Sequence, residues 1–257
     1  MSEALILPLT IRSRDSKFWD ISIYFTNLDA LKRCVKTMLE KDLEIIDMHL
    51  TRSYDRGGAY ILVDASYSKV DVNLLNELIR DVDGIQEINI AEIPVKGVGV
   101  HYLLYPMQLG PFRVTLIPDK IFSTLINEIK EKWGSAGEYS LYEIGRLVGE
   151  SLYKTTTSVF RTSGMELLEI ISLLFRTFGW ASKTHIIEYD LEKGIITTRI
   201  YDNIECRYIK TNKPNSQFIR GVITGIIGKI LKRKTQTIEE KCIAKGDPNC
   251  QFKTKTQ

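Results

Sequence analysis

The residues best suited to chemistry lie near the C-terminal end of the sequence. Glu239 stands three residues before Cys242, and Cys250 follows the turn-forming sequence Lys245-Gly-Asp-Pro-Asn249. The turn would join two strands and let the two thiols approach each other. Thiolates at that distance suit zinc, which takes four sulfur, nitrogen or oxygen ligands, and Glu239 would be a third ligand. Reduced thiols and a disulfide between the two cysteines are the alternatives.

Catalytic motifs are absent from the sequence. It contains no Gly-x-Ser-x-Gly, no phosphate-binding glycine loop and no dinucleotide-binding fingerprint. Its three histidines, His49, His101 and His185, are scattered, and none is next to a cysteine. We therefore expect a protein that is not an enzyme and that has no organic cofactor.

The charge pattern gives no reason to expect specific nucleic-acid binding. The formal net charge is only +3, and basic and acidic residues are interleaved along the chain. Residues 218–231 are apolar but include Arg220 and Lys229, and they are fewer than the ~20 residues that span a membrane. We expect a core helix there and no membrane insertion. No secretion signal is recognised, and four cysteines are too few for a disulfide scaffold, which favours a cytoplasmic location.

The N-terminal third alternates between strand and helix patterns. Apolar spacing predicts strands at residues 18–25, 43–50, 60–65 and 85–93, and helices at 72–82 and after Asp29, which would be the helix cap. The order β-α-β-β-α-β is the ferredoxin-like plan. The closing sequence, residues 83–90, resembles that of ACT-type regulatory domains, which pair through sheet edges and often hold amino acids. The glycine that those domains carry in the first strand-to-helix turn is absent from residues 27–30. We expect residues 1–95 to form an ACT-like regulatory or dimerisation domain of a homodimer.

A proline and two glycines within residues 94–99 predict a hinge before a second domain, residues 100–257. Its expected elements are a strand at 111–117, helices at 119–133, 140–156, 164–178 and 214–231, a hairpin at 185–190 and 195–201, and strands at 238–244 and 250–255. Residues 134–137 would break the first two helices apart, and the helix at 164–178 would be buried nearly all round. The fold class is α+β.

The C-terminal motif resembles that of a known family. Glu-x-x-Cys followed by Gly-Asp-Pro-x-Cys-x-Phe, after a glycine-containing amphipathic helix, resembles the 4-vinyl reductase domain family over residues 100–255. That family is described as binding small molecules or hydrocarbons, and its fold is shared with phenol-sensing domains and TRAPP-type trafficking subunits. The resemblance implies zinc ligands at Glu239, Cys242 and Cys250. The family's fourth cysteine corresponds to Ser216, a poor zinc ligand, so either Cys206 reaches the site or the metal is lost.

Two glycine pairs, Gly145 with Gly149 and Gly221 with Gly225, predict close helix packing rather than ligand contact. Around these helices the resemblance implies an apolar cavity. The candidate lining residues are large, apolar and near helix ends, although they could also simply fill the core; they are Phe160, Leu174, Phe178, Trp180 and Phe218. Phenol sensors of this fold grip the hydroxyl with a histidine and a tryptophan, and the corresponding helical region here has no histidine.

These observations predict a ligand-responsive regulatory protein. An apolar small molecule would bind in the C-terminal domain, and the signal would pass to an unidentified protein partner. The alternative is an interaction scaffold without a small ligand. A cavity of roughly 300 Å³ or more among the C-terminal helices would distinguish the first function from the second.

Overall fold

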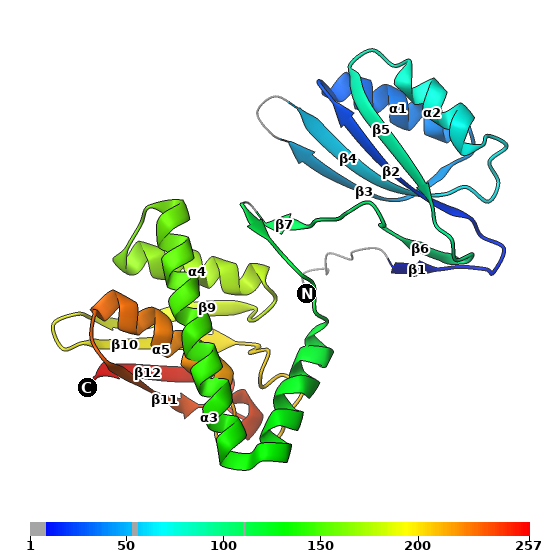
Figure 1. The fold of residues 1–257 in the computed structure, drawn as a ribbon. Coiled ribbons are helices and arrows are strands. Elements are labelled where there is room, and N and C mark those ends of the chain that lie inside the picture. The colour runs from blue at the N-terminus through cyan, green and yellow to red at the C-terminus, as the bar shows by residue number, and fades with distance from the viewer. Residues whose placement is uncertain (1–8, 53–55, 110) are drawn as a thin grey trace. The chain divides into compact units, whose positions relative to one another are not determined.

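The computed structural model describes residues 9–52, 56–109 and 111–257 and divides into two compact units, Met1–Thr115 and Leu116–Gln257 (Figure 1). The elements of the first unit are β1 (Leu9–Ile11), β2 (Phe18–Phe25), α1 (Leu28–Glu40), β3 (Glu44–Arg52), β4 (Gly57–Asp64), α2 (Val72–Arg80), β5 (Ile85–Glu92), β6 (Val98–Val100), β7 (Gln108–Leu109) and β8 (Phe112–Arg113). Those of the second are α3 (Asp119–Phe160), α4 (Gly164–Thr177), β9 (Lys183–Asp190), β10 (Ile195–Tyr201), α5 (Gln217–Leu231), β11 (Thr235–Lys241), the 3-10 turn η1 (Ile243–Lys245) and β12 (Cys250–Thr256).

The first unit confirms the β-α-β-β-α-β plan. Its main sheet has the antiparallel order β3-β4-β2-β5, with α1 and α2 on one face. Alternate residues of the central strands, such as Ile21, Ile23 and Ile61, are fully buried beneath the two helices. This alternation is the strand period expected when one face of a sheet is packed against helices.

The cap of α1 differs from the expectation. Asn27, not Asp29, is the N-cap, and its side chain accepts a hydrogen bond from the amide of Ala30 at 2.9 Å. Asp29 lies in the first helical turn, where its charge complements the helix dipole. Both residue types favour helix starts, so the sequence alone did not fix which of them caps.

The segment expected to be a hinge, residues 94–99, lies inside the first unit. Within it begins β6, which pairs antiparallel with β1. The division between the units falls later, after Thr115. The strand expected at 111–117 is reduced to Phe112–Arg113, paired with β7.

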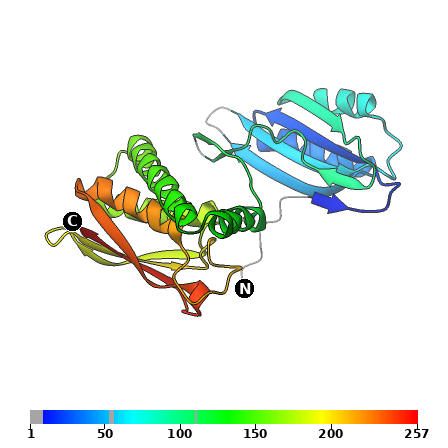
Figure 2. The same cartoon turned by 60° about the horizontal axis from the view of Figure 1, so that its bottom comes forward.

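The second unit is a four-stranded antiparallel sheet, in the order β11-β12-β10-β9, with its helices on one face (Figure 2). The helix α3 is bent at Gly134, whose φ of 53° and ψ of −131° interrupt the helix. This confirms the expected break after residue 133. The last strand pair is shorter than expected, because β11 ends at Lys241 and residues 243–245 form a 3-10 turn instead of continuing the strand to 244.

The glycine pairs confirm close packing between α3 and α5. A Cβ placed at Gly145 or Gly149 would overlap with a carbonyl oxygen of α5, and one at Gly221 or Gly225 would overlap with a carbonyl oxygen of α3. Each helix therefore presents two glycines to the backbone of the other. The two axes approach more closely than any side chain would allow.

The helix α4 is less buried than expected. Its buried residues are Leu167, Leu168, Ile171 and Phe175, whereas Leu173 is 67% exposed. The continuous apolar run of the sequence thus covers both an inward face and an outward face. Among the residues that the structure describes, no helix combines the length and the hydropathy of a membrane span.

Candidate functional site

A β-bulge places the acidic and sulfur ligands on one side of β11. Residues three apart on a regular strand face opposite sides. The pairing register of β11 with β12 shifts between Glu239 and Lys241, so that Glu239 and Cys242 both face the interior. Because the extra residue is Glu240, the Glu-x-x-Cys spacing becomes a same-side pair.

Four potential ligand atoms converge beside this bulge. The ligand atoms of Cys206, Glu239, Cys242 and Cys250 lie within 4.8 Å of one another, and all four residues are buried. The sulfur atoms of Cys206 and Cys242 are 3.5 Å apart, and all cysteines of the chain are free thiols. The structure therefore contains a buried cysteine and glutamate cluster that could hold a metal ion, and Cys206 reaches it from the loop between β10 and α5.

Ser216, at the start of α5, links the members of the cluster. Its hydroxyl donates to Glu239 Oε1 at 2.7 Å and lies 3.0 Å from Cys206 Sγ. Its amide donates to Glu239 Oε2 at 3.0 Å. Asn203, which is fully buried, donates to the Ser216 hydroxyl at 2.9 Å. The serine thus holds the cluster together by hydrogen bonds.

The acidic groups of the cluster cannot all ionise together without a cation. Burial raises the pKa of Glu239 to about 8, although hydrogen bonds from Ser216 act in the opposite direction. Hydrogen bonds with Cys242 and Cys250, together with burial, raise the pKa of Cys206. Hydrogen bonds from Cys206 and Cys250 lower the pKa of Cys242 despite its burial. Without metal the cluster therefore concentrates its negative charge on Cys242.

This donor set fits a structural metal ion. Three thiols and one carboxylate supply four ligand atoms, the number that a closed tetrahedral zinc site requires. A divalent cation would displace the protons of Cys206, Cys250 and Glu239 and would compensate the buried charge. Such a closed site supplies folding free energy rather than catalysis.

We predict that Glu239 makes the metal-free protein sensitive to pH. Its pKa is about 8 in the folded chain and ordinarily 4.5, so the folded state binds this proton more tightly than the unfolded state. The contribution is fully present below pH 4.5 and is lost as the pH rises to about 8. In urea titrations with chelator, Glu239→Gln should therefore be more stable than the parent at pH 8 and similar to it at pH 4. Equal pH profiles for both proteins would contradict this electrostatic account.

A buried ion pair positions the loop that carries Cys206. Glu205 is 1% exposed and accepts from the amides of Phe218 at 3.1 Å and Ile219 at 2.9 Å, in the first turn of α5. Lys130 Nζ lies 2.8 Å from the Glu205 carboxylate. Because the Ser216 hydroxyl is engaged in the cluster, Glu205 takes over the capping of α5.

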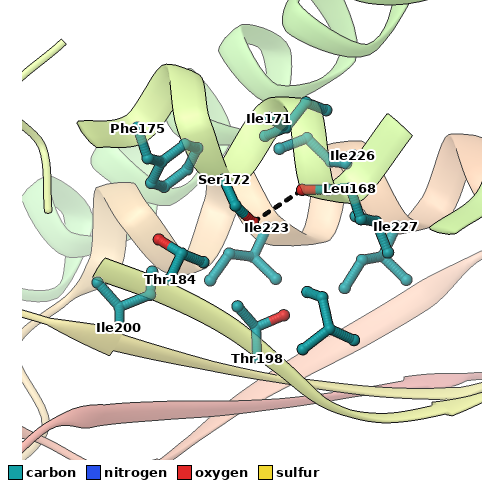
Figure 3. Close-up of a pocket in the computed structure, with 11 residues that line it drawn as sticks. Leu168, Ile171, Ser172, Phe175, Thr184, Thr198, Ile200, Ile223, Ile226 and Ile227 are labelled. Carbon is teal, nitrogen blue, oxygen red and sulfur yellow. Dashed lines mark hydrogen bonds between the residues drawn. The ribbon is translucent and has the colours of Figure 1, made fainter. Parts of the chain in front are cut away.

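An apolar cavity lies between α4, α5 and the strands β9 and β10 (Figure 3). Its volume is about 20 Å³, and its lining is mainly leucine, isoleucine and phenylalanine. Three hydroxyl-bearing residues, Ser172, Thr184 and Thr198, also line it. Ser172 donates to the Leu168 carbonyl at 2.7 Å, whereas the buried hydroxyl of Thr184 has no hydrogen-bond partner among the described residues.

The ligand-binding residues expected from the sequence gather beside the cavity, not around it. Trp180 contacts Phe178 and Phe218 with ring centroids 5.5 and 5.9 Å apart. Phe160 is 46% exposed at the end of α3, and Leu174 is half-buried on α4. The lining residues are instead Leu168, Ile171, Ser172, Phe175, Thr184, Ile186, Thr198, Ile200, Ile223, Ile226 and Ile227. The isoleucine stripe of residues 218–231 was the sequence signal for one wall, but nothing in the sequence showed which residues face it.

A family model for the 4-vinyl reductase domain matches residues 196–256. The phenol-responsive sensory domain of the transcription activator PoxR, in complex with phenol, is similar to this chain with a TM-score of 0.50 and 16% identity, over 58% of this chain and 79% of that chain. This likeness is one of fold. None of the curated protein sequences matches the chain.

Further solved structures are similar at lower scores. A vinyl-4-reductase family protein from Methanocaldococcus jannaschii is 20% identical over 56% of this chain and 84% of that chain, with a TM-score of 0.42. The trafficking protein particle complex subunit 3 from Naegleria fowleri, covalently bound to palmitic acid, is 16% identical over 54% and 92%, with a TM-score of 0.43. The ACT domain of a GTP pyrophosphokinase from Chlorobium tepidum is 13% identical over 30% and 99%, with a TM-score of 0.26.

Proposed function

The chain carries a 4-vinyl reductase domain at residues 196–256, and from this we propose that it is a non-enzymatic, ligand-responsive regulatory protein whose second unit binds an apolar small molecule. The observation that carries the proposal is the apolar cavity beneath α4, which contains the buried Thr184 hydroxyl, unpartnered among the described residues. A buried polar group without a hydrogen bond is costly, so a ligand with one polar group would satisfy it. The fold shared with a phenol-responsive sensory domain supports the same function.

Ligand binding requires the cavity to enlarge. A volume of about 20 Å³ holds about one water molecule. The helix α4 forms one wall and is bounded by residues with left-handed backbone conformations, Arg161 and Gly164 before it and Gly179 after it. We propose that α4 moves away from β9 and β10 when the ligand enters, because backbone changes at these connections would leave the helix itself intact.

We propose that zinc binds at Cys206, Glu239, Cys242 and Cys250. These residues come from the loop before α5, from β11 and its end, and from the start of β12. The ion would fasten the start of α5 to the sheet. Because Ile223, Ile226 and Ile227 of α5 line the cavity, the same centre would keep one wall fixed while α4 moves.

We further propose that the chain is a cytoplasmic homodimer that signals through a protein partner. The free state of all four cysteines favours a reducing compartment. In the first unit, β3 is an edge strand of the main sheet and exposes Met48 (40%) and Leu50 (49%). An exposed edge with apolar side chains is suited to pairing with a second copy of the chain.

Native mass spectrometry tests the ligand, the metal and the subunit number together. The protein is purified without chelator or added metal, and its native mass is compared with the denatured mass. We expect a dimer that retains zinc and an organic molecule. Ile171→Trp, which places a large ring in the cavity, should remove the organic mass, whereas Leu173→Trp, on the exposed side of the same helix, should keep it.

The small cavity volume favours a second candidate function, an interaction scaffold without a small ligand. In that case the parent protein and both tryptophan variants would be free of organic mass. Equal stability of the parent with and without a panel of alkylphenols and fatty acids would support the scaffold. A ligand-dependent rise in melting temperature that is absent from Ile171→Trp would exclude it.

A further inference from the structure

The main sheet of the first unit has a second face, opposite α1 and α2, that carries polar residues in register. Leu62 of β4 is paired with Asp20 of β2 on one side and with Asp47 of β3 on the other. The next residues on this face are Tyr60 and, paired with it, His49. Cross-strand partners point to the same side of a sheet, so Asp20, Asp47 and His49 share one face.

A β-bulge brings Asp47 to that face. The register between β3 and β4 shifts between Ile45, which pairs with Val63, and Asp47, which pairs with Leu62. On a regular strand Ile45 and Asp47 would face the same side. The extra residue reverses the side chains that follow, and the two polar ones, Asp47 and His49, leave the helix-covered side.

The segment after β6 adds the second histidine. His101 Nδ1 lies 2.7 Å from Asp20 Oδ1, and the amide of Leu103 donates to Asp20 Oδ2 at 2.5 Å. A carboxylate only accepts hydrogen bonds, so the His101 Nδ1–H must be the donor. The side chains of His101 and Asp20 are 4% and 0% exposed. This buried pair fixes the ring of His101 and leaves its Nε2 directed at Asp47.

Asp47 receives both imidazoles. Its Oδ2 lies 3.1 Å from His101 Nε2 and 2.7 Å from His49 Nε2. The His49 nitrogen is buried without a geometrically satisfactory hydrogen bond among the described residues. The ligand atoms of Asp47, His49 and His101 lie within 4.8 Å of one another. Two carboxylates, Asp20 and Asp47, thus lie beside two imidazoles, and a divalent cation would balance their charge.

We propose that Asp47, His49 and His101 bind a divalent transition-metal ion in the first unit, with Asp20 as the carboxylate that orients His101. Two histidines and one carboxylate form a donor set used for zinc and non-haem iron. Ligands about 2.1 Å from a metal are about 3.0–3.4 Å from each other, near the distances from Asp47 to the two rings. A histidine ligand whose other nitrogen donates to a carboxylate is the usual arrangement.

The site is open, unlike the cysteine cluster of the second unit. Asp47 and His49 side chains are each 26% exposed, so solvent reaches two of the three ligands. Three protein ligands leave at least one coordination position for water or for an anionic or carbonyl-bearing ligand. The ion would therefore exchange with solution more readily than one held in the cluster of buried thiols. This proposal does not depend on the function proposed for the second unit.

Cobalt binding to the full chain tests the site. Cobalt(II) bound to thiolates gives an intense charge-transfer band in the near ultraviolet, which nitrogen and oxygen ligands do not produce. Bound cobalt is counted by equilibrium dialysis of the chelator-treated protein. Asp47→Asn and His49→Gln should each lose one equivalent of cobalt relative to the parent and keep the thiolate band unchanged. His185→Gln, at the histidine of β9, should lose none.

The variants are chosen so that a folding defect cannot explain the result. Asp47 and His49 are partly exposed, and urea titrations without metal should give parent-like midpoints for both. Asp20→Asn should weaken cobalt affinity about 10- to 100-fold through the orientation of His101. The proposal is overturned if the parent and the two ligand variants bind equal amounts of cobalt, or if all cobalt bound by the parent depends on the thiolate band.

Discussion

Replacing Glu205 with alanine is expected to lower the free energy of unfolding of the second unit by about 3–5 kcal/mol. The change removes the partner of Lys130, whose side chain is only 9% exposed, and leaves a buried cation uncompensated. It also removes the acceptor of the Phe218 and Ile219 amides. Urea titration of the full chain by circular dichroism measures the loss, and hydrogen exchange of peptides from α5 locates it.

An exposed ion pair provides the matched control for Glu205→Ala. Lys213 and Glu138 are 2.7 Å apart, with side chains 65% and 28% exposed, so Glu138→Ala should cost about 1 kcal/mol or less. Lys130→Met combined with Glu205→Gln should recover part of the stability, because neither residue then carries a charge. If Glu205→Ala costs no more than Glu138→Ala, the buried pair does not hold the loop of Cys206.

Replacing Gly145 or Gly221 with alanine is expected to lower the free energy of unfolding by about 3 kcal/mol each. The added methyl group of Gly145→Ala overlaps with the Phe218 carbonyl, and that of Gly221→Ala overlaps with the Tyr142 carbonyl. Backbone atoms cannot rotate away, so α3 and α5 must separate. The higher helix propensity of alanine, worth about 1 kcal/mol, only partly offsets this cost. Thermal and urea unfolding measure the difference.

Gly228, in the same helix α5, is the matched control. A Cβ there would meet the Thr235 hydroxyl at 3.1 Å rather than the backbone of another helix. Gly228→Ala should therefore change stability by about 1 kcal/mol or less. The double variant Gly145→Ala with Gly221→Ala should cost less than the sum of the two, since the first substitution already separates the helices. Strict additivity would mean that the two glycines do not share one contact.

The fold was largely predictable because its signals are local. Strand and helix periods of the N-terminal third gave the β-α-β-β-α-β order, and the register of β2, β4 and β5 confirms it. Gly134 could be recognised as a helix break because glycine readily adopts the positive φ found there. The paired glycines predicted close packing, and their contacts confirm it. Each of these depends on residues within one or two helical turns.

The candidate sites were less predictable because they depend on pairing registers. The Glu239, Cys242 and Cys250 motif identified a cysteine and glutamate cluster, and Cys206 was an open alternative for its fourth member. The cavity lining was missed, since Phe178, Trp180 and Phe218 stack with one another beside it. Large aromatic residues mark a core in a sequence, but only packing decides whether they fill space or surround it.

By itself the sequence determined which residue types were present and where helices, strands and breaks lie, because these follow from short-range periodicity and turn chemistry. The tertiary structure alone decided which distant side chains meet. One bulge in β11 turns Cys242 to the side of Glu239, and another in β3 turns Asp47 and His49 toward His101. A bulge reverses every side chain that follows it, yet it leaves little trace in the sequence, since it is set by the partner strand.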